Sequence, residues 1–420
     1  MAGNDRLLLL TSTKAYETRL FTDAAGKLGI PLVLGTDRCQ RLDDPWADGA
    51  LPLHFEDPEG AARLILEQAR TQPIRALVAL GDRAPRTAAL ACQALGLPYN
   101  PPPATAACRD KFLARQMLRA AGVEVPPFAR FSLDEDPRRC ARKVSFPCVL
   151  KPLSLSGSQG VIRADTPEQF VVAFERIAAL LRQTKIRVQR EETHNWLLAE
   201  GFLPGREMAL EGLLDRGRLR VLALFDKPDP LEGPIFEETL YVTPSREPEE
   251  TQRTIVAAVE QAARALMLCH GPIHAEVRLT SAGPRILEVA ARSIGGLCSR
   301  ALRFRAGMSL PELILRHAWG LPIDPVVREE GAAGVLMIPI PRAGVFQGVE
   351  GIEEARRIPG IEEIAITAKE AHPILPLPEG SSYLGFIFAR GRRPAEVEEA
   401  LRAAHRRLRI HIRSRFPVAP

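Results

Sequence analysis

The sequence predicts a chain of α/β and α+β parts, about three in number. At 420 residues it is too long for one ordinary hydrophobic core. Proline-rich stretches at residues 98–103 and 322–325 divide it, because proline interrupts helices and central strands. Apolar residues at 46% and charged residues at 25% are typical of a folded globular protein.

The first part alternates short apolar runs with amphipathic stretches, which indicates βαβ units and a small parallel sheet. The expected strands are 6–11, 31–34 and 74–80, and the expected helices are 16–28 and 58–70. The last strand ends at Gly81-Asp82, where an open α/β sheet places its ligands.

The second part begins with a helix from Asp110 to near Gly122, and mixes strands and helices after it. Its expected strands are 148–151, 160–163, 196–200, 208–214 and 219–225, its helices are 167–181 and 249–268, and it ends in a hairpin at 273–290. The third part has expected strands at 334–338 and 383–389 and a helix at 394–408, which predicts a small α+β module.

The hairpin at 273–290 separates two sets of side chains by parity. Its apolar face would carry Ile273, Val277, Leu279, Leu287 and Val289, and its other face His274, Glu276, Arg278, Glu288 and Arg292. A turn centred near Ala282 puts Glu276 opposite Glu288, about 4.5–5.5 Å apart, where like charges destabilise a sheet. Either a divalent cation such as Mg²⁺ lies between them, or Arg278 and Arg292 compensate them in an ion-pair ladder.

A lysine and a loop of small residues suggest a phosphate site. Lys151 ends an apolar strand and is followed by Ser156, Gly157, Ser158 and Gly160. Such a loop can close backbone N–H groups around phosphate oxygens while the lysine supplies charge. A Ser/Gly hairpin loop without a ligand is the alternative. Lys111, at a helix start, is a weaker candidate, since most such lysines are solvated.

The segment LLAEGFLPGRE carries a further candidate site. Glu200 ends a strand and is followed by Gly201, Phe202 and Leu203, whose backbone groups could read an adenine edge. Glu207 could hold ribose hydroxyls. Alone, this pattern is unspecific.

Taken in order, these segments resemble the ATP-grasp superfamily from about Cys108 to Leu321. The resemblance implies a Rossmann-like pre-ATP-grasp domain over 1–105 and an ATP-grasp domain over 106–323, with a lid lobe at about 128–198. A C-terminal ligase-type α+β module would follow over 324–420.

The resemblance also implies roles for the candidate residues. Lys111 and Lys151 would contact the phosphates of ATP beneath the loop of Ser156, Gly157, Ser158 and Gly160. The stretch from Glu200 through Gly201 and Phe202 to Leu203 would bind adenine, and Glu207 the ribose. Glu276 and Glu288 would bind Mg²⁺ or Mn²⁺.

One departure narrows the resemblance. Many members carry Asn two residues after the second metal carboxylate, where this chain has Ala290, so one metal ligand is unaccounted for. The pattern from Glu288 to Arg292, followed by Gly295-Gly296, looks like the L-amino acid ligase branch, which includes dipeptide synthetases and resembles carnosine synthase. That branch implies Arg292 at the acyl phosphate and Lys227 at the transferred phosphoryl group, and an amino-acid pocket formed by Glu237, Glu238, His274, Gly295 and Gly296.

A structural role remains the alternative for two of these residues. Arg292 can form a salt bridge to Glu276 or Glu288, and His274 can be a satisfied buried histidine.

The implied activity is ATP-dependent joining of a carboxylate to an amine, with two amino acids as the expected substrates. The acid would be phosphorylated first, and ADP and phosphate released. A biotin-carboxylase-like or purine-pathway enzyme is the catalytic alternative, disfavoured by Ala290. A non-catalytic nucleotide-binding regulatory protein is the other, disfavoured by the intact set of charged candidates.

Composition restricts the setting of this activity. Seven scattered cysteines without metal-ligand spacing indicate reduced thiols. No apolar run approaches the roughly 20 residues of a membrane span. Interleaved charges with a net +5 give little support for nucleic-acid binding. We therefore expect a cytoplasmic protein, and from the family a homodimer.

Overall fold

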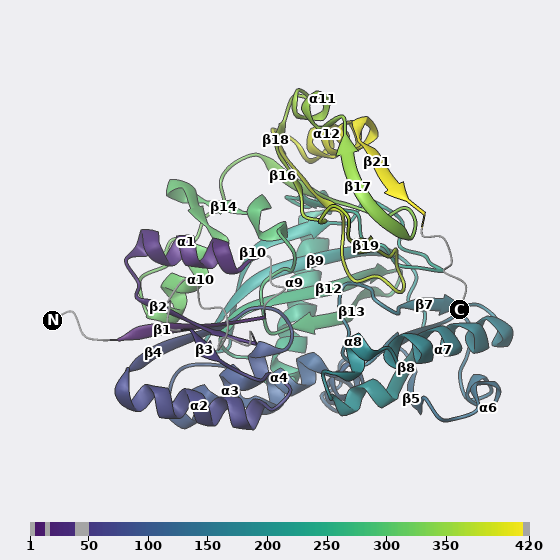
Figure 1. The fold of residues 1–420 in the computed structure, drawn as a ribbon, viewed down its shortest axis with the longest axis horizontal. Coiled ribbons are helices and arrows are strands. Elements are labelled where there is room, and N and C mark those ends of the chain that lie inside the picture. The colour runs from purple at the N-terminus through teal and green to yellow at the C-terminus, as the bar shows by residue number, and fades with distance from the viewer. Residues whose placement is uncertain (1–4, 13–16, 38–49, 415–420) are drawn as a thin grey trace.

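The computed structural model describes residues 5–12, 17–37 and 50–414 (Figure 1). The N-terminal part lies at the lower left of Figure 1, the lid lobe at the lower right and the C-terminal module at the top. Tyr16, expected at the start of the first helix, and Cys39 lie outside the described residues. The other six cysteines are free thiols, as expected.

The N-terminal part contains the expected parallel sheet. The sheet has the order β3-β2-β1-β4, and its neighbouring strands are parallel. The elements are β1 (Arg6–Thr11), α1 (Thr18–Leu28), β2 (Leu32–Thr36), β3 (Leu51–Pro52), α2 (Pro58–Thr71), β4 (Ile74–Ala79) and α3 (Ala84–Leu95). Side chains of β1 alternate between two cores, with Leu7 and Leu9 in one and Leu8 and Leu10 in the other. The unbroken leucine run is therefore explained by burial on both faces.

Two short helices connect this part to the lid lobe. α4 (Pro102–Arg109) begins at a proline, which the first helical turn tolerates, and α5 (Lys111–Ala120) begins after Asp110. The Asp110 carboxylate accepts hydrogen bonds from the N–H groups of Phe112 and Leu113, as an N-cap residue does.

The lid lobe is an antiparallel sheet of order β5-β8-β6-β7, covered by α7. Its elements are β5 (Phe128–Ser132), α6 (Pro137–Ala141), β6 (Cys148–Pro152), β7 (Ile162–Ala164), α7 (Pro167–Leu181), α8 (Thr184–Arg187) and β8 (Trp196–Gly201).

An eight-stranded sheet of order β13-β12-β9-β10-β11-β16-β20-β18 forms the centre of the molecule. Its strands are β9 (Arg206–Asp215), β10 (Arg218–Asp226), β11 (Leu240–Thr243), β12 (Gly271–Thr280), β13 (Gly283–Ala290), β16 (Ala332–Ile338), β18 (Ile361–Ile366) and β20 (Gly385–Gly391). β11 pairs with β16, so the sheet continues across the proline-rich stretch at 322–325. The C-terminal module thus extends the central sheet with β16, β20 and β18, and its other strands form a separate sheet of order β19-β17-β21.

Helices cover this sheet and connect it to the N-terminal part. They are α9 (Glu249–Ala265), α10 (Leu310–Trp319), α11 (Ile352–Arg356) and α12 (Pro394–Arg407). α10 packs against α1 and β4, and one hydrophobic core joins α10 and β1 to the central strands. The short strands β14 (Arg303–Phe304), β15 (Met308–Ser309), β17 (Gly344–Glu350), β19 (Pro373–Ile374) and β21 (Arg409–Arg413) complete the described strands.

The hairpin β12–β13 has the expected pair of glutamates, but not for the expected reason. Glu276 faces Glu288 in the register, as predicted. The centre of the turn, however, lies half a residue before the predicted centre at Ala282, because Thr280 pairs with Gly283. A bulge at Leu287 then restores the register, and the two offsets cancel.

The bulge makes one predicted core residue wrong. Leu287 was expected on the apolar face, but Val277 pairs with Ile286, and Ile286 is the residue buried in the core. Leu287 instead lines the central cavity, and its carbonyl oxygen accepts a hydrogen bond from Arg115 at 2.7 Å.

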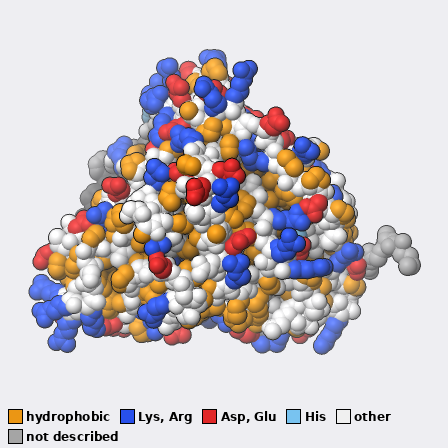
Figure 2. All heavy atoms as spheres, turned by 180° about the vertical axis from the view of Figure 1, so that it is seen from behind, with side chains coloured by type: hydrophobic (Ala, Val, Ile, Leu, Met, Phe, Trp, Pro, Cys, Tyr) orange, Lys and Arg blue, Asp and Glu red, His pale blue; other side chains and the backbone are white. Residues whose placement is uncertain are grey.

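The surface agrees with the mixed charge of the sequence. On the face shown in Figure 2, acidic and basic side chains are scattered among hydrophobic and uncharged ones. Among the described residues, no helix combines the length and hydropathy of a membrane span.

Gly334 on β16 tests the packing of α12 on the sheet. A Cβ atom there would lie 2.8 Å from Val397 Cγ1 and 2.9 Å from the Tyr241 carbonyl oxygen. Gly334→Ala should therefore lower the free energy of unfolding by about 1–3 kcal/mol in urea denaturation. Gly26→Ala in α1, where a Cβ meets nothing within 4 Å, should instead raise it by about 0.5–1 kcal/mol. Equal effects of the two substitutions would contradict this packing.

Candidate active site

A cavity of about 510 Å³ lies where the N-terminal part, the lid lobe, the central sheet and the C-terminal module meet. The predicted site residues that line it are Lys111, Lys151, Ser156, Gly157, Ser158, Glu200, Gly201, Phe202, Leu203, Glu207, Glu238, His274, Glu276, Glu288, Arg292, Gly295 and Gly296. Three predicted site residues, Gly160, Lys227 and Glu237, are not part of its lining.

The facing glutamates of the hairpin each have a lysine partner. Glu288 lies 3.3 Å from Lys111 Nζ, which also donates a hydrogen bond to the Leu155 carbonyl oxygen. Glu276 lies 3.2 Å from Lys227 Nζ. The two carboxylates therefore sit at the cavity wall with a cation on each side, and neither Arg278 nor Arg292 forms the ion-pair ladder considered as the alternative.

Lys227 is the centre of a buried cluster of charges. Its Nζ lies 2.6 Å from Glu207, 2.6 Å from Glu238 and 3.2 Å from Glu276. Burial alone would lower the pKa of Lys227, but the three carboxylates raise it well above its usual value. Burial and the charge of Glu276 raise the pKa of Glu238 to about 7. Lys227 therefore does not line the cavity itself, but it holds three carboxylates together at the cavity wall.

The carboxylate set fits a hard divalent cation. Carboxylate oxygens of Glu207, Glu238 and Glu276 all lie within 4.8 Å of one another, and Glu288 lies opposite Glu276 on the neighbouring strand. Burial would raise the pKa of Glu276, but Lys227 and His274 hold it well below its usual value, so Glu276 is ionised. Carboxylate oxygens grouped in this way are ligands that Mg²⁺ and Mn²⁺ prefer.

Glu200 has its side chain turned into an ion-pair network. It contacts Lys151 closely and accepts a hydrogen bond from Arg115 Nε at 2.9 Å. Burial would raise its pKa, but Arg115 and Lys151 lower it to about 2. The backbone N–H groups of Gly201 and Phe202 donate to the Pro127 and Pro147 carbonyl oxygens. The sequence had suggested that these two N–H groups are free to bind adenine. Because they are already bonded, only the other backbone groups of residues 200–203 are available to a ligand.

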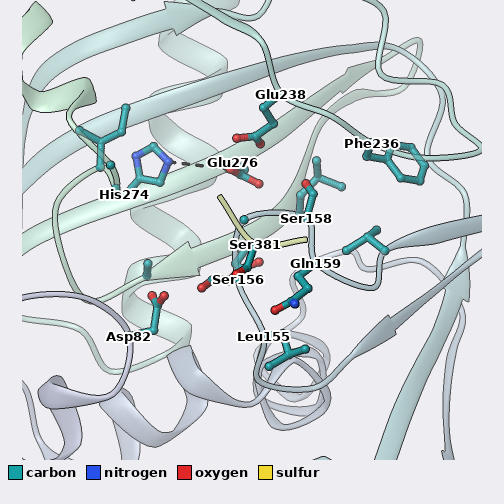
Figure 3. Close-up of a pocket in the computed structure, with 18 of the residues that line it drawn as sticks. Asp82, Leu155, Ser156, Ser158, Gln159, Phe236, Glu238, His274, Glu276 and Ser381 are labelled. Atoms are coloured by element: carbon teal, nitrogen blue, oxygen red, sulfur yellow. Dashed lines mark ion pairs between the residues drawn. The ribbon is translucent and has the colours of Figure 1, made fainter. Parts of the chain in front are cut away.

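The loop between β6 and β7 is closed onto the C-terminal module. The Gly160 N–H donates to the Pro378 carbonyl oxygen at 2.9 Å, and Gln159 Nε2 to that of Glu379 at 2.9 Å. Figure 3 shows Ser156, Ser158 and Gln159 of this loop beside Ser381, with Glu238, His274 and Glu276 grouped across the cavity. Gly160 therefore fixes the loop position from outside the lining.

Arg292 is paired with the N-terminal part and with neither glutamate. Its Nε donates to Asp82 Oδ1 at 2.6 Å. Burial would raise the pKa of Asp82, but Arg292 and Arg109 hold it well below its usual value. The end of β4 therefore supplies the carboxylate that orients Arg292, at the place where the sequence predicted a ligand.

His274 is both buried and part of the cavity lining. Its Nδ1 lies 3.1 Å from Glu211 Oε2, and its Nε2 lies 3.9 Å from Glu276. Burial would lower the pKa of His274, but the hydrogen bond to Glu211 and the nearby carboxylate of Glu276 raise it to about 9. The ring is thus cationic near neutral pH and adds positive charge beside the glutamates.

Sequence reasoning missed two buried acids at the site. Glu17 lines the cavity just before α1, and its Oε1 has no hydrogen-bond partner among the described residues. Glu211 on β9 lies under His274 and also accepts a hydrogen bond from the Ile294 N–H at 3.0 Å. Glu17 lies near the carboxyl end of β1, as Asp82 does for β4, and that position was the one available signal.

Three family profiles match successive parts of the chain. They are the ATP-grasp N-terminal domain at residues 22–99, the ATP-grasp domain at 144–301 and the L-amino acid ligase C-terminal domain 2 at 336–413.

Individual relatives agree with these profiles. The crystal structure of an L-amino acid ligase from Bacillus licheniformis superposes with a TM-score of 0.82 at 27% identity, covering 98% of this chain and 100% of that one. Alanine–anticapsin ligase of Bacillus subtilis (strain 168) is 30% identical over 54% of this chain and 50% of its own length. Carnosine synthase 1 of Gallus gallus is 30% identical over 71% of this chain and 34% of its own length. The chain thus spans half or less of the last two proteins.

Glu17 gives the site a pH-dependent contribution to stability. Burial raises its pKa from 4.5 to about 8, against the attraction of Arg292. The folded protein therefore holds a proton that the unfolded chain releases, and the resulting stability is complete below pH 4.5 and lost as pH rises through about 8.

Glu17→Gln should remove much of this loss. In urea denaturation, wild type should lose a few kcal/mol between about pH 4.5 and pH 8, since each pKa unit corresponds to about 1.4 kcal/mol. The variant should lose less, and retain the falls that Glu238 and His274, whose pKa values are also raised, contribute in the same direction. Exposed Glu250→Gln is the control and should behave as wild type. An unchanged slope in Glu17→Gln would contradict a protonated buried acid.

Proposed function

Because the chain belongs to the ATP-grasp superfamily, we propose that it is an ATP-dependent ligase that joins an amino acid to a second amino acid or another amine. The acid would be converted to an acyl phosphate, and ADP and phosphate released. The observation that carries the proposal is the pair Glu276 and Glu288, which face each other in a cavity that also holds Lys111, Lys151 and Arg292.

We propose that the lid lobe binds the nucleotide. Lys111 and Lys151, with Ser156, Gly157 and Ser158, would surround the phosphates, because the loop offers N–H groups and hydroxyls next to two cations. Adenine would lie against Phe202 and Leu203 at the end of β8. The assignment of Glu207 to ribose is weakened by its contacts, since its carboxylate is held by Lys227 at 2.6 Å and by Arg278 at 3.2 Å.

We propose Mg²⁺, with Mn²⁺ as a substitute, at Glu276 and Glu288, with Glu207 and Glu238 nearby as further carboxylates. When bound, the ion would supply positive charge that offsets the negative charge of the phosphates, with Glu276 and Glu288 as its protein ligands. Lys227 holds Glu207, Glu238 and Glu276 together, so we propose that it positions these carboxylates rather than contacting the phosphoryl group.

Arg292 would bind the carboxylate that becomes the acyl phosphate. Its guanidinium carries a fixed charge and several donors, and Asp82 holds one edge of it in place. The half-buried Glu237 does not line the cavity, so Glu238 and His274 are the better candidates for contacting an amino-acid substrate. The closed loop at Gln159 and Gly160 would exclude water, which otherwise hydrolyses an acyl phosphate.

A bicarbonate-activating or purine-pathway enzyme is not favoured, because the C-terminal part matches the L-amino acid ligase profile. From the family resemblance alone, we also propose that the protein is cytoplasmic and forms a homodimer. Sedimentation equilibrium would test the homodimer.

A screen of ATP with pairs of amino acids tests the activity directly. We expect at least one pair of amino acids to stimulate release of ADP and phosphate. Mass spectrometry should then detect a product whose mass is that of the two amino acids minus one water. Bicarbonate with the same amines should release no phosphate. Tight Mg–ATP binding without turnover on any acid would instead support a regulatory protein.

Glu288→Gln tests the metal assignment. It keeps the size of the side chain but removes a charge, so Mg²⁺-dependent ADP release should fall by about two orders of magnitude or more. Exposed Glu250→Gln is the matched control and should retain full activity. Circular dichroism should be unchanged in both. Wild-type activity in Glu288→Gln would overturn the assignment.

A further inference from the structure

A second group of metal-binding side chains lies outside the cavity. Asp215 ends β9, His270 directly precedes β12, and His317 lies in the last turn of α10. One ligand atom from each lies within 4.8 Å of the other two. The pairing of Gly271 with Leu214 brings Asp215 and His270 together, and α10, which packs against β12, adds His317. None of the three lines the cavity described above.

The two imidazole rings contact each other in a tilted arrangement. Their ring centroids are 4.4 Å apart, with an interplanar angle of 30°. His317 Nε2 is buried, lies 3.7 Å from Asp215 Oδ1, and has no hydrogen-bond partner among the described residues. Only 7% of the His317 side chain is exposed. A buried nitrogen left without a partner is costly, so this geometry points to an unseen ligand.

The chemical state of the group suits a metal. Burial, with the neighbouring His317, lowers the pKa of His270 to about 4, and burial also lowers that of His317. Both shifts favour the neutral imidazole ring, which is the form that coordinates metals.

We propose that Asp215, His270 and His317 form a binding site for a divalent transition-metal ion, with Zn²⁺ as the expected occupant. Two imidazole nitrogens and one carboxylate oxygen are a ligand set typical of Zn²⁺, with water as the fourth ligand. Mg²⁺ is disfavoured, because it prefers six oxygen ligands.

The required rearrangement is small. Ligands at about 2.0–2.2 Å from a tetrahedral ion lie roughly 3.3–3.5 Å from one another. The atoms here are within 4.8 Å, so closure takes little more than 1 Å. Asp215 is 44% exposed at a strand end, which leaves it free to rotate and leaves a path for the ion and its water.

An ion at this site would join two parts of the molecule. It would connect the β9–β12 edge to α10, which packs on α1 and β4 of the N-terminal part. The same region is already linked by Asn100, whose Oδ1 accepts hydrogen bonds from the backbone N–H groups of Cys269 and His270 at 2.8 and 2.9 Å. The ion would therefore stabilise the contact between the N-terminal part and the central sheet, independently of the ligase reaction.

Co²⁺ titration of the chelator-treated, full-length protein tests the site. Excess Mg²⁺ is kept present to occupy the carboxylates of the cavity. We expect one Co²⁺ per chain to give the intense visible absorption of a tetrahedral site with nitrogen ligands, and Zn²⁺ to displace it. Zn²⁺ should also raise the melting temperature.

Three variants and one control assign the ligands. His270→Gln and His317→Gln should weaken Co²⁺ binding by about tenfold to a hundredfold or more and abolish the Zn²⁺-dependent rise in melting temperature. Asp215→Asn changes a half-exposed side chain, so it should keep the fold and still weaken Co²⁺ binding. It therefore tests the site even if a histidine variant does not fold. Exposed His372→Gln should bind as wild type.

The opposite results overturn the proposal. Absence of a tetrahedral Co²⁺ spectrum in wild type, or the same affinity and spectrum in Asp215→Asn and His317→Gln, would mean an adventitious ion only. ATP-dependent ligation by the chelator-treated protein in Mg²⁺ is expected in either case, so failure of this site and failure of the proposed ligase activity are distinguishable.

Discussion

The cavity depends on holding several carboxylates together where water is scarce. Glu207, Glu238 and Glu276 surround one ammonium group, that of Lys227, and Glu288 is opposed by Lys111. Like charges this close repel strongly in a low-dielectric setting, and removing one partner of a buried pair leaves an uncompensated charge. The lysines make the arrangement stable without a ligand, and the remaining negative charge is available for a cation that arrives with a nucleotide.

Each part of the fold supplies one side of this arrangement. The hairpin β12–β13 presents Glu276 and Glu288 side by side, and α5 and β6 bring the lysines. The N-terminal sheet contributes Asp82, which orients Arg292. The C-terminal module contributes Pro378 and Glu379, which hold the loop over the cavity. Because β16 pairs with β11, that module is fixed to the sheet that carries the glutamates, so the cover and the floor of the site form one continuous structure.

Much of the fold was predictable, because local patterns set it. The N-cap at Asp110, the helix at Pro167–Leu181 and the leucines of β1 were all identified from periodicity and capping. The pairing of Glu276 with Glu288 was predicted correctly through two errors that cancelled, since no sequence rule places the bulge at Leu287. The same bulge made the expected burial of Leu287 wrong.

The sequence by itself determined the order of the parts, many of the strands and helices and most of the charged candidates that line the cavity, because periodicity, turns and charged residues at strand ends are local properties. Tertiary structure alone decided which charges meet. Arg292 pairs with Asp82 from 210 residues away, Glu200 with Lys151 and Arg115, and Lys227 with carboxylates on three different segments. It also brought Glu17, Glu211 and the Asp215–His270–His317 group into place. Such pairings depend on how sheets and helices dock, and the energy of a charge depends on its burial and partners, neither of which is written in neighbouring residues.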